Sequence, residues 1–167
     1  MQADFKDTLN QHQALLSRVA ASYEANEALQ QELLQEIALA VWQGLTRFNG
    51  EASLKTYILK IAHNRAVTHV CKEVKKQEES GHDNMAWEFA RGNESAEPHV
   101  VAEQQGNIEQ LLIAVRALPV AMRQVLTLTL EGLSYLEIAE VCGITKNHVV
   151  VLLQRAKTQL QQELKHV

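Results

Sequence analysis

Apolar residues recur at steps of three and four along most of this sequence, and this spacing constrains the fold more than any other feature. The period places them on one side of an α-helix. Leu34, Ile37, Val41 and Leu45 show it most clearly. Because no stretch of useful length alternates apolar and polar residues as a strand would, the chain is predicted to be all-α.

Turn and cap residues divide this pattern into separate helices. Ser53 and Thr145 are placed to cap the helices that follow them, and Ser134 with Glu137 forms a capping-box pattern. Gly143 supplies a left-handed position at a turn. Helices are therefore expected over about residues 8–23, 26–44, 54–76, 108–118, 119–131, 135–142 and 146–165.

The segment 79–107 interrupts the helical pattern and differs in composition from its flanks. It holds one basic residue against six acidic ones, includes Gly81, Gly92 and Pro98, and has little periodicity. Such a composition is typical of a linker. We therefore expect two small helical domains, residues 1–78 and 108–167, joined by a flexible acidic linker at 79–107.

Charge is unevenly distributed, so the net charge of −4 does not exclude a nucleic-acid partner. Residues 55–76 carry six basic residues against one acidic residue. A phosphate backbone responds to charges within a Debye length of about 8–10 Å and not to the distant sum. The local basic segment remains compatible with DNA binding, whereas the acidic total predicts weak non-specific affinity.

Several classes of protein are not favoured by this sequence. The seven histidines have no metal-ligand spacing and no nucleophile partner, so neither a metal, a cofactor, a small-molecule substrate nor an enzymatic activity is expected. Cys71 and Cys142 are far apart, which fits a reducing cytoplasm without a disulfide framework. No apolar run reaches the ~20 residues of a membrane span, and the polar N-terminus lacks a signal-peptide core.

The segment "GLSYLEIAEVCGITKNHVVVLLQRAK", residues 132–157, has the pattern of a helix-turn-helix. Ala139, Gly143 and Val149 occupy the positions at which two helices cross and turn, which predicts that the second helix enters a DNA major groove. A plain helical hairpin with the same packing needs is the alternative. Within the second helix, Val149, Leu152 and Leu153 are assigned to the core.

The remaining positions of that second helix would face DNA. Val150 and Val151 can touch thymine methyl groups but cannot donate to guanine or phosphate. An exposed valine pair also suits a protein partner. The predicted DNA-facing residues are Lys146, Asn147, His148, Val150, Val151, Gln154, Arg155 and Lys157.

A second pattern lies in "LLQEIALAVWQGLTRFNGEASLKTYILKIAHNRAVTHV", residues 33–70. It resembles the core-binding and promoter −10 region of the extracytoplasmic-function (ECF) group of bacterial RNA polymerase sigma factors, and the C-terminal helix-turn-helix resembles the −35 region of the same group. The order and separation of the two blocks are also those of the group. The matching residues are Glu32, Leu33, Gln35, Glu36, Trp42, Arg47, Phe48, Gly50, Ser53, Lys55, Thr56, Tyr57, Ile61, Ala62 and Asn64.

This resemblance implies a set of partners and roles. Core RNA polymerase would be bound through the β′ clamp helices and the β flap, promoter DNA at its −10 and −35 elements, and an anti-sigma factor is a further possible partner. Carboxylates on the second helix suit a basic partner surface. The polymerase-binding residues would be Glu32, Gln35 and Glu36, and the −10 residues Asn49, Lys55, Tyr57, Lys60, His63 and Asn64.

Two other interpretations remain open at this level. The helix lacks the basic residues that the ECF group commonly has at Val150 and Leu152, so the chain could be a sigma-like interaction protein that binds polymerase or a regulator without promoter recognition. It could also be an independent helix-turn-helix regulator, although the acidic segment 79–107 opposes tight phosphate binding. The acidic segment could moreover cover the basic side of the third helix in the free protein.

Overall fold

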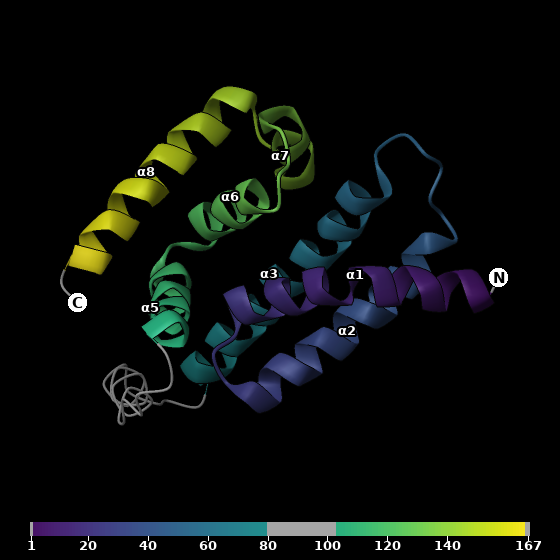
Figure 1. The fold of residues 1–167 in the computed structure, drawn as a ribbon, viewed down its shortest axis with the longest axis horizontal. Coiled ribbons are helices and arrows are strands. Elements are labelled where there is room, and N and C mark those ends of the chain that lie inside the picture. Colours follow the sequence, from purple (N-terminus) through teal and green to yellow (C-terminus); the bar gives the residue numbers. More distant parts are fainter. Residues whose placement is uncertain (1, 80–102, 166–167) are drawn as a thin grey trace.

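The computed structural model describes residues 2–79 and 103–165, and within these ranges the chain forms seven α-helices and no strand (Figure 1). The all-α prediction is confirmed for these residues. The helices are α1 (Gln2–Tyr23), α2 (Glu27–Leu45), α3 (Leu54–Glu79), α5 (Glu103–Ala117), α6 (Val120–Leu130), α7 (Tyr135–Cys142) and α8 (Lys146–Lys165).

Helices α1, α2 and α3 pack together as an N-terminal bundle. Asn26 starts α2, because its side chain accepts a hydrogen bond from the Leu29 amide at 3.1 Å. Leu33, Ile37 and Val41 follow at four-residue steps and are almost fully buried. Burying each such side chain contributes about 1.5–3 kcal/mol, so this one face holds α2 on its neighbours.

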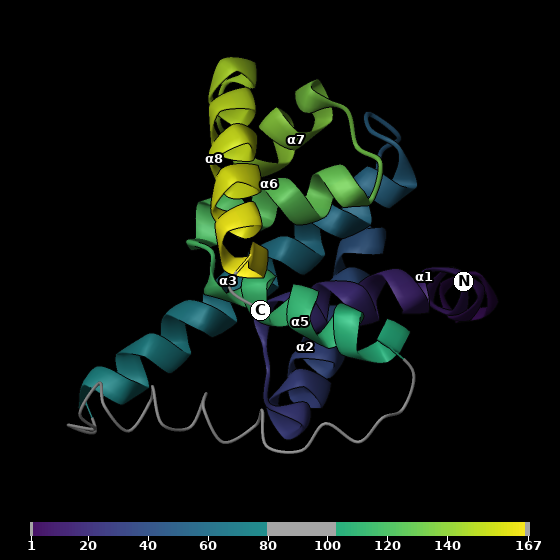
Figure 2. The same cartoon turned by 60° about the vertical axis from the view of Figure 1, so that its left-hand side comes forward.

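Helices α5, α6, α7 and α8 form a C-terminal bundle in which α8 packs on the other three (Figures 1 and 2). Helix α6 follows Pro119, whose missing amide is not needed at a helix start. It buries Val125, Leu126 and Leu128. Helix α8 lies on the outside of this bundle, away from α1, α2 and α3 (Figures 1 and 2).

The two bundles correspond to the two expected helical domains, but they also pack against each other. Helix α1 contacts α5 and α6, and α3 contacts α6 and α7. Buried side chains from both bundles belong to one continuous apolar cluster. The sequence pattern alone did not predict this shared core.

Two helix starts differ from the expectation. Helix α1 begins at Gln2 instead of about residue 8, and α5 begins at Glu103, inside the range expected for the linker. Polar residues at both starts show no apolar period but are acceptable helix formers once a neighbouring turn exists. The rest of the expected linker, residues 80–102, lies outside the described residues, and so do its predicted flexibility and its proposed contact with α3.

Membrane-spanning helices and metal-binding clusters are both absent from the described residues. None of their helices combines the length and apolar character needed to span a bilayer. They also contain no group of three or more histidine, cysteine or acidic side chains arranged to hold a metal ion.

Candidate nucleic-acid and polymerase interfaces

The α7–α8 turn has the caps predicted for a helix-turn-helix. The Glu137 amide donates to Ser134 Oγ and the Ser134 amide to Glu137 Oε1, each at 3.2 Å, so the capping box is closed in both directions. Gly143 has φ 69°, the left-handed conformation that a glycine adopts without cost. Thr145 Oγ1 accepts from the His148 amide at 3.2 Å and starts α8. The turn is therefore set by local bonds.

The valines of α8 divide between the core and the surface. Val149, Leu152 and Leu153 are buried, as predicted, whereas Val151 is 41% exposed and Val150 is half-buried. The six polar residues among the predicted DNA-facing ones are all exposed: Lys146, Asn147, His148, Gln154, Arg155 and Lys157. All eight predicted DNA-facing residues thus have access to solvent on the outer helix of the bundle.

Helix α2 presents one uninterrupted exposed face opposite its buried one. Glu32, Gln35 and Glu36 are all exposed and lie together on this face. Leu39 and Trp42 continue it and are 53% and 51% exposed. An apolar end beside two carboxylates is the composition expected of a surface that binds a protein with a basic, partly apolar patch.

A hollow of about 1210 Å³ lies where the end of α2, the 46–53 loop and the exposed side of α3 meet the start of α1. Phe48, Tyr57 and Asn64 line it. The ring centroids of Phe48 and Tyr57 are 5.1 Å apart, and Tyr57 Oη donates to the Gly44 carbonyl at 2.7 Å. The hollow therefore joins a fixed aromatic wall with an exposed amide, which suits an unstacked base. Three other predicted −10 residues are exposed but do not line it: Asn49, Lys55 and Lys60.

The comparisons with known proteins match both bundles. Residues 8–75 match Sigma-70 region 2 and residues 108–160 match Sigma-70, region 4, so together the two regions cover most of the chain. The chain is a sigma factor of the ECF group. It directs transcription initiation, and its family acts without catalysing a reaction itself.

This sigma factor also has relatives that align over nearly its whole length. It is 28% identical to the RNA polymerase sigma-H factor of Pseudomonas aeruginosa, over 92% of this chain and 81% of that protein. The sigma factor RpoE of Bartonella quintana, solved with the anti-sigma factor NepR, aligns with TM-score 0.77 at 20% identity over 97% of each chain. CnrH, solved with the cytosolic domain of CnrY, aligns with TM-score 0.70 at 18% identity, over 99% of this chain and 90% of that one. The two solved structures share the fold.

One predicted DNA contact of this sigma factor is wrong in the present conformation. His63 is completely buried, with Nδ1 2.7 Å from Tyr23 Oη, and cannot reach a ligand. It lies four residues after Leu59 and on the same buried side of α3 as Ala62, so the helical period, not its polarity, decides its place. Burial lowers the pKa of His63 to about 3, so the ring is neutral at physiological pH.

The sequence analysis also missed a buried polar group between the two regions. Arg123 of α6 is only 8% exposed and donates from Nη2 to the carbonyls of Arg116 and Leu118 at 2.6 and 3.0 Å. Its guanidinium lies 5.5 Å from the centre of the Tyr23 ring of α1. An arginine in the otherwise apolar run of α6 was the available signal. The Arg123 side chain thus contacts both the end of α5 and α1.

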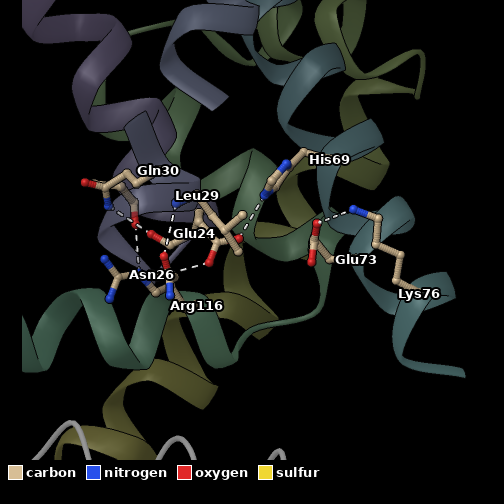
Figure 3. Close-up of polar contacts among 9 residues, drawn as sticks. Glu24, Asn26, Leu29, Gln30, His69, Glu73, Lys76 and Arg116 are labelled. Carbon is tan, nitrogen blue, oxygen red and sulfur yellow. Dashed lines mark hydrogen bonds and ion pairs between the residues drawn. The ribbon is translucent and has the colours of Figure 1, made fainter. Parts of the chain in front are cut away.

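A second polar group holds the end of α1 against α3 and α5 (Figure 3). Glu24 Oε2 lies 2.8 Å from His69 Nε2 of α3, and the Glu24 carbonyl accepts from Gln30 Nε2 at 2.9 Å. Arg116 Nε of α5 donates to the Ala21 carbonyl at 2.8 Å. His69 therefore has a structural partner in Glu24.

Proposed function

We propose a division of labour between the two regions. Residues 1–78 bind core RNA polymerase and the promoter −10 element, residues 108–167 bind the −35 element, and residues 79–107 set the spacing between them. This arrangement melts the −10 element and places polymerase at the promoter. As in other sigma factors, the site of action would be the cytoplasm.

Polymerase binding is assigned to the exposed face of α2, with the β′ clamp helices as partner and the β flap as a second contact for the C-terminal region. Glu32, Gln35 and Glu36 supply the polar part of this face. The observation that carries the assignment is that α2 packs on α1 and α3 and leaves this face open. The two solved relatives bound to partner proteins support an anti-sigma factor as a further partner, which co-purification from a lysate would test.

Reversing charge on this face tests the proposed function. A Glu32→Lys/Glu36→Lys variant should lose about tenfold or more in affinity for core polymerase, because a basic partner surface then meets two cations. It should also lose the specific run-off transcripts that the wild-type chain directs from genomic fragments. Glu27→Lys is the matched control, since Glu27 is exposed on the same helix but points to another side. Equal affinities for the two variants, or no wild-type transcripts, would contradict the assignment.

The −10 element is assigned to the hollow and the adjacent part of α3. Tyr57 and Asn64 line the hollow and offer a ring and an amide to an unstacked base. Asn49, Lys55 and Lys60 would hold the neighbouring backbone. His63 is not retained as a direct contact, because it is buried.

The −35 element is assigned to the exposed residues of α8. Lys146, Asn147, His148, Gln154, Arg155 and Lys157 supply the polar contacts, and Val150 and Val151 the apolar ones. The exposure of these residues on the outer helix supports the assignment. The valines imply fewer phosphate contacts than a basic recognition helix makes.

Adding a positive charge at position 151 of α8 tests this assignment. Replacing Val151 by arginine should raise affinity for a duplex carrying the −35 element. It should also steepen the dependence of log K on log salt by about 0.9, the value of one added phosphate contact. Fluorescence anisotropy at several salt concentrations measures both quantities, with Val151→Gln as the uncharged control. An unchanged slope would show that position 151 does not face the duplex.

A further inference from the structure

The last turn of α2 is bonded directly to the aromatic wall of the hollow. The Gly44 carbonyl accepts hydrogen bonds from both the Arg47 amide, at 3.0 Å, and Tyr57 Oη, at 2.7 Å. It is one of the carbonyls at a helix end that have no partner further along the same helix. The first bond leads the chain out of α2 into the 46–53 loop, and the second holds the side chain of Tyr57 on α3 against that turn.

Phe48 completes this aromatic wall. Its amide donates to the Leu45 carbonyl at 3.3 Å, so the loop leaves α2 through a second bond to the last turn. Its ring lies with its centroid 5.1 Å from that of Tyr57, at an angle of 46° between the ring planes. Aromatic rings at this separation attract each other. The position of Phe48 therefore depends on that of Tyr57, which in turn depends on the Gly44 carbonyl.

Gly44 also lies where α3 approaches α2 too closely for a side chain. A Cβ atom at position 44 would lie 2.5 Å from Ile61 Cδ1 and 3.5 Å from Tyr57 Oη. The first distance is well inside the separation of about 3.5–4.0 Å at which carbon atoms attract each other. Helix propensity favours alanine over glycine, so the close approach of Ile61, not the local preference, explains a glycine here. Ile61 itself lines the hollow, and its displacement would change the wall.

We propose that Gly44 is a positioning residue for the aromatic wall of the hollow. Its carbonyl orients Tyr57 and the start of the 46–53 loop, and its missing side chain lets Ile61 pack against α2. Gly44 acts through these neighbours and does not itself touch a base. A wall that is ordered before DNA arrives avoids the cost of ordering its side chains on binding. The inference rests on the proposed function insofar as the hollow receives −10 bases.

Alanine at position 44 of the full chain tests the missing side chain. Gly44→Ala should weaken binding of a short fluorescent single-stranded DNA of random sequence about fivefold, because the added methyl group displaces Ile61 or separates α2 from α3. Binding of a random-sequence duplex should not change, since its stacked bases do not enter the hollow. Gly106→Ala is the matched control, because Gly106 also lies within a helix, α5, and an added Cβ atom would meet no neighbouring element within 4 Å in the described part of the chain.

Shortening Ile61 should make room for the added methyl group. Ile61→Val removes Cδ1, the atom that a Cβ atom at position 44 would meet, and leaves Cγ1, which would lie 3.6 Å away. In the Ile61→Val background, Gly44→Ala should therefore change single-stranded DNA affinity by less than about twofold. A loss of about fivefold in both backgrounds would overturn the role of the missing side chain.

Tyr57→Phe tests the role of the Gly44 carbonyl, because it removes the hydroxyl that donates to this carbonyl and keeps the ring. The loss of one hydrogen bond should weaken binding of the same single-stranded DNA about threefold to tenfold. Binding of the duplex should again stay at the wild-type value. A Tyr57→Phe chain that binds single-stranded DNA as the wild type does would show that the hydroxyl positions nothing that a base contacts.

The ring of Phe48 reports on the wall without DNA. Its NMR resonances, assigned by their absence from Phe48→Leu, should shift in Gly44→Ala because the Tyr57 ring that packs on it has moved. They should have the same values in Ile61→Val and in the combined Gly44→Ala/Ile61→Val variant. Phe48 resonances that do not move in Gly44→Ala would overturn the inference, whatever happens to DNA binding.

Asn64→Ala separates the inference from the function on which it rests, since Asn64 lines the hollow but is not bonded to Gly44. If Asn64→Ala weakens single-stranded binding whereas Gly44→Ala and Tyr57→Phe do not, the positioning role fails and the −10 assignment stands. If the Phe48 resonances respond as expected but none of the three variants alters single-stranded binding, Gly44 still positions the wall and the −10 assignment fails.

Discussion

The free energy of unfolding is expected to fall by about 1.4 kcal/mol for each pH unit below about 6.5, through His63 alone. Burial lowers the pKa of His63 to about 3 in the folded chain, whereas the unfolded ring keeps its ordinary value. Between these two pH values, His63 binds a proton in the unfolded chain but not in the folded chain. Stability is therefore fully present above the unfolded pKa and is lost as the pH falls toward the folded one.

Burial keeps this histidine neutral, and Tyr23 is its polar neighbour. Its hydroxyl lies 2.7 Å from His63 Nδ1 and its ring meets the imidazole edge-on, with the centroids 5.4 Å apart. His63 Nε2 is buried and has no hydrogen-bond partner in the described part of the chain. In either tautomer the charged ring would carry a buried Nε2–H with no acceptor, which is the costly case for a buried charge.

Urea unfolding at pH 7.5 and pH 5.0 measures this effect. The wild-type chain should lose about 2 kcal/mol through His63 over this range. His63→Gln should lose about 2 kcal/mol less than the wild type, whatever its stability at pH 7.5, because a side-chain amide does not titrate. The ring resonances of His63, assigned by their absence from the variant, should stay constant down to pH 5. Equal losses in both proteins, or a ring that titrates near pH 6.5, would refute the buried neutral histidine.

Replacing Leu152 by alanine should destabilise the C-terminal region by about 2–5 kcal/mol, the range for truncating a buried leucine. Leu152 is 7% exposed and belongs to the core that α8 shares with α6 and α7. Its truncation removes apolar contacts and leaves a cavity. The same change at the preceding residue should be nearly silent, because Val151 is 41% exposed.

The pair Leu152→Ala and Val151→Ala therefore separates the two roles within the aliphatic run of α8. Thermal unfolding should show a large drop in midpoint for the first and a change within about 0.5 kcal/mol for the second. Under conditions in which both remain folded, only Val151→Ala should weaken binding to a −35 duplex directly. Similar midpoints for the two variants would mean that α8 is rotated from the orientation described here.

The sequence by itself determined those features that depend on neighbouring residues. The helices follow from apolar spacing, and the capping box joins Ser134 and Glu137, only three positions apart. The left-handed Gly143 needs no distant partner. The division of α8 into buried Val149 and exposed Val151 also follows from the helical period alone.

Only the tertiary structure decided which polar residues lose contact with water. The helical period puts His63 on the same side of α3 as Leu59, but only the packing of α1 on α3 gives it Tyr23, 40 positions away, as a partner. Glu131 pairs with Arg18 across 113 positions, and no local sequence pattern around either residue predicts this pairing. The helical period and the caps are encoded within a few residues, whereas burial and pairing depend on how whole helices pack. For that reason the contact between the two bundles could be seen only in the fold.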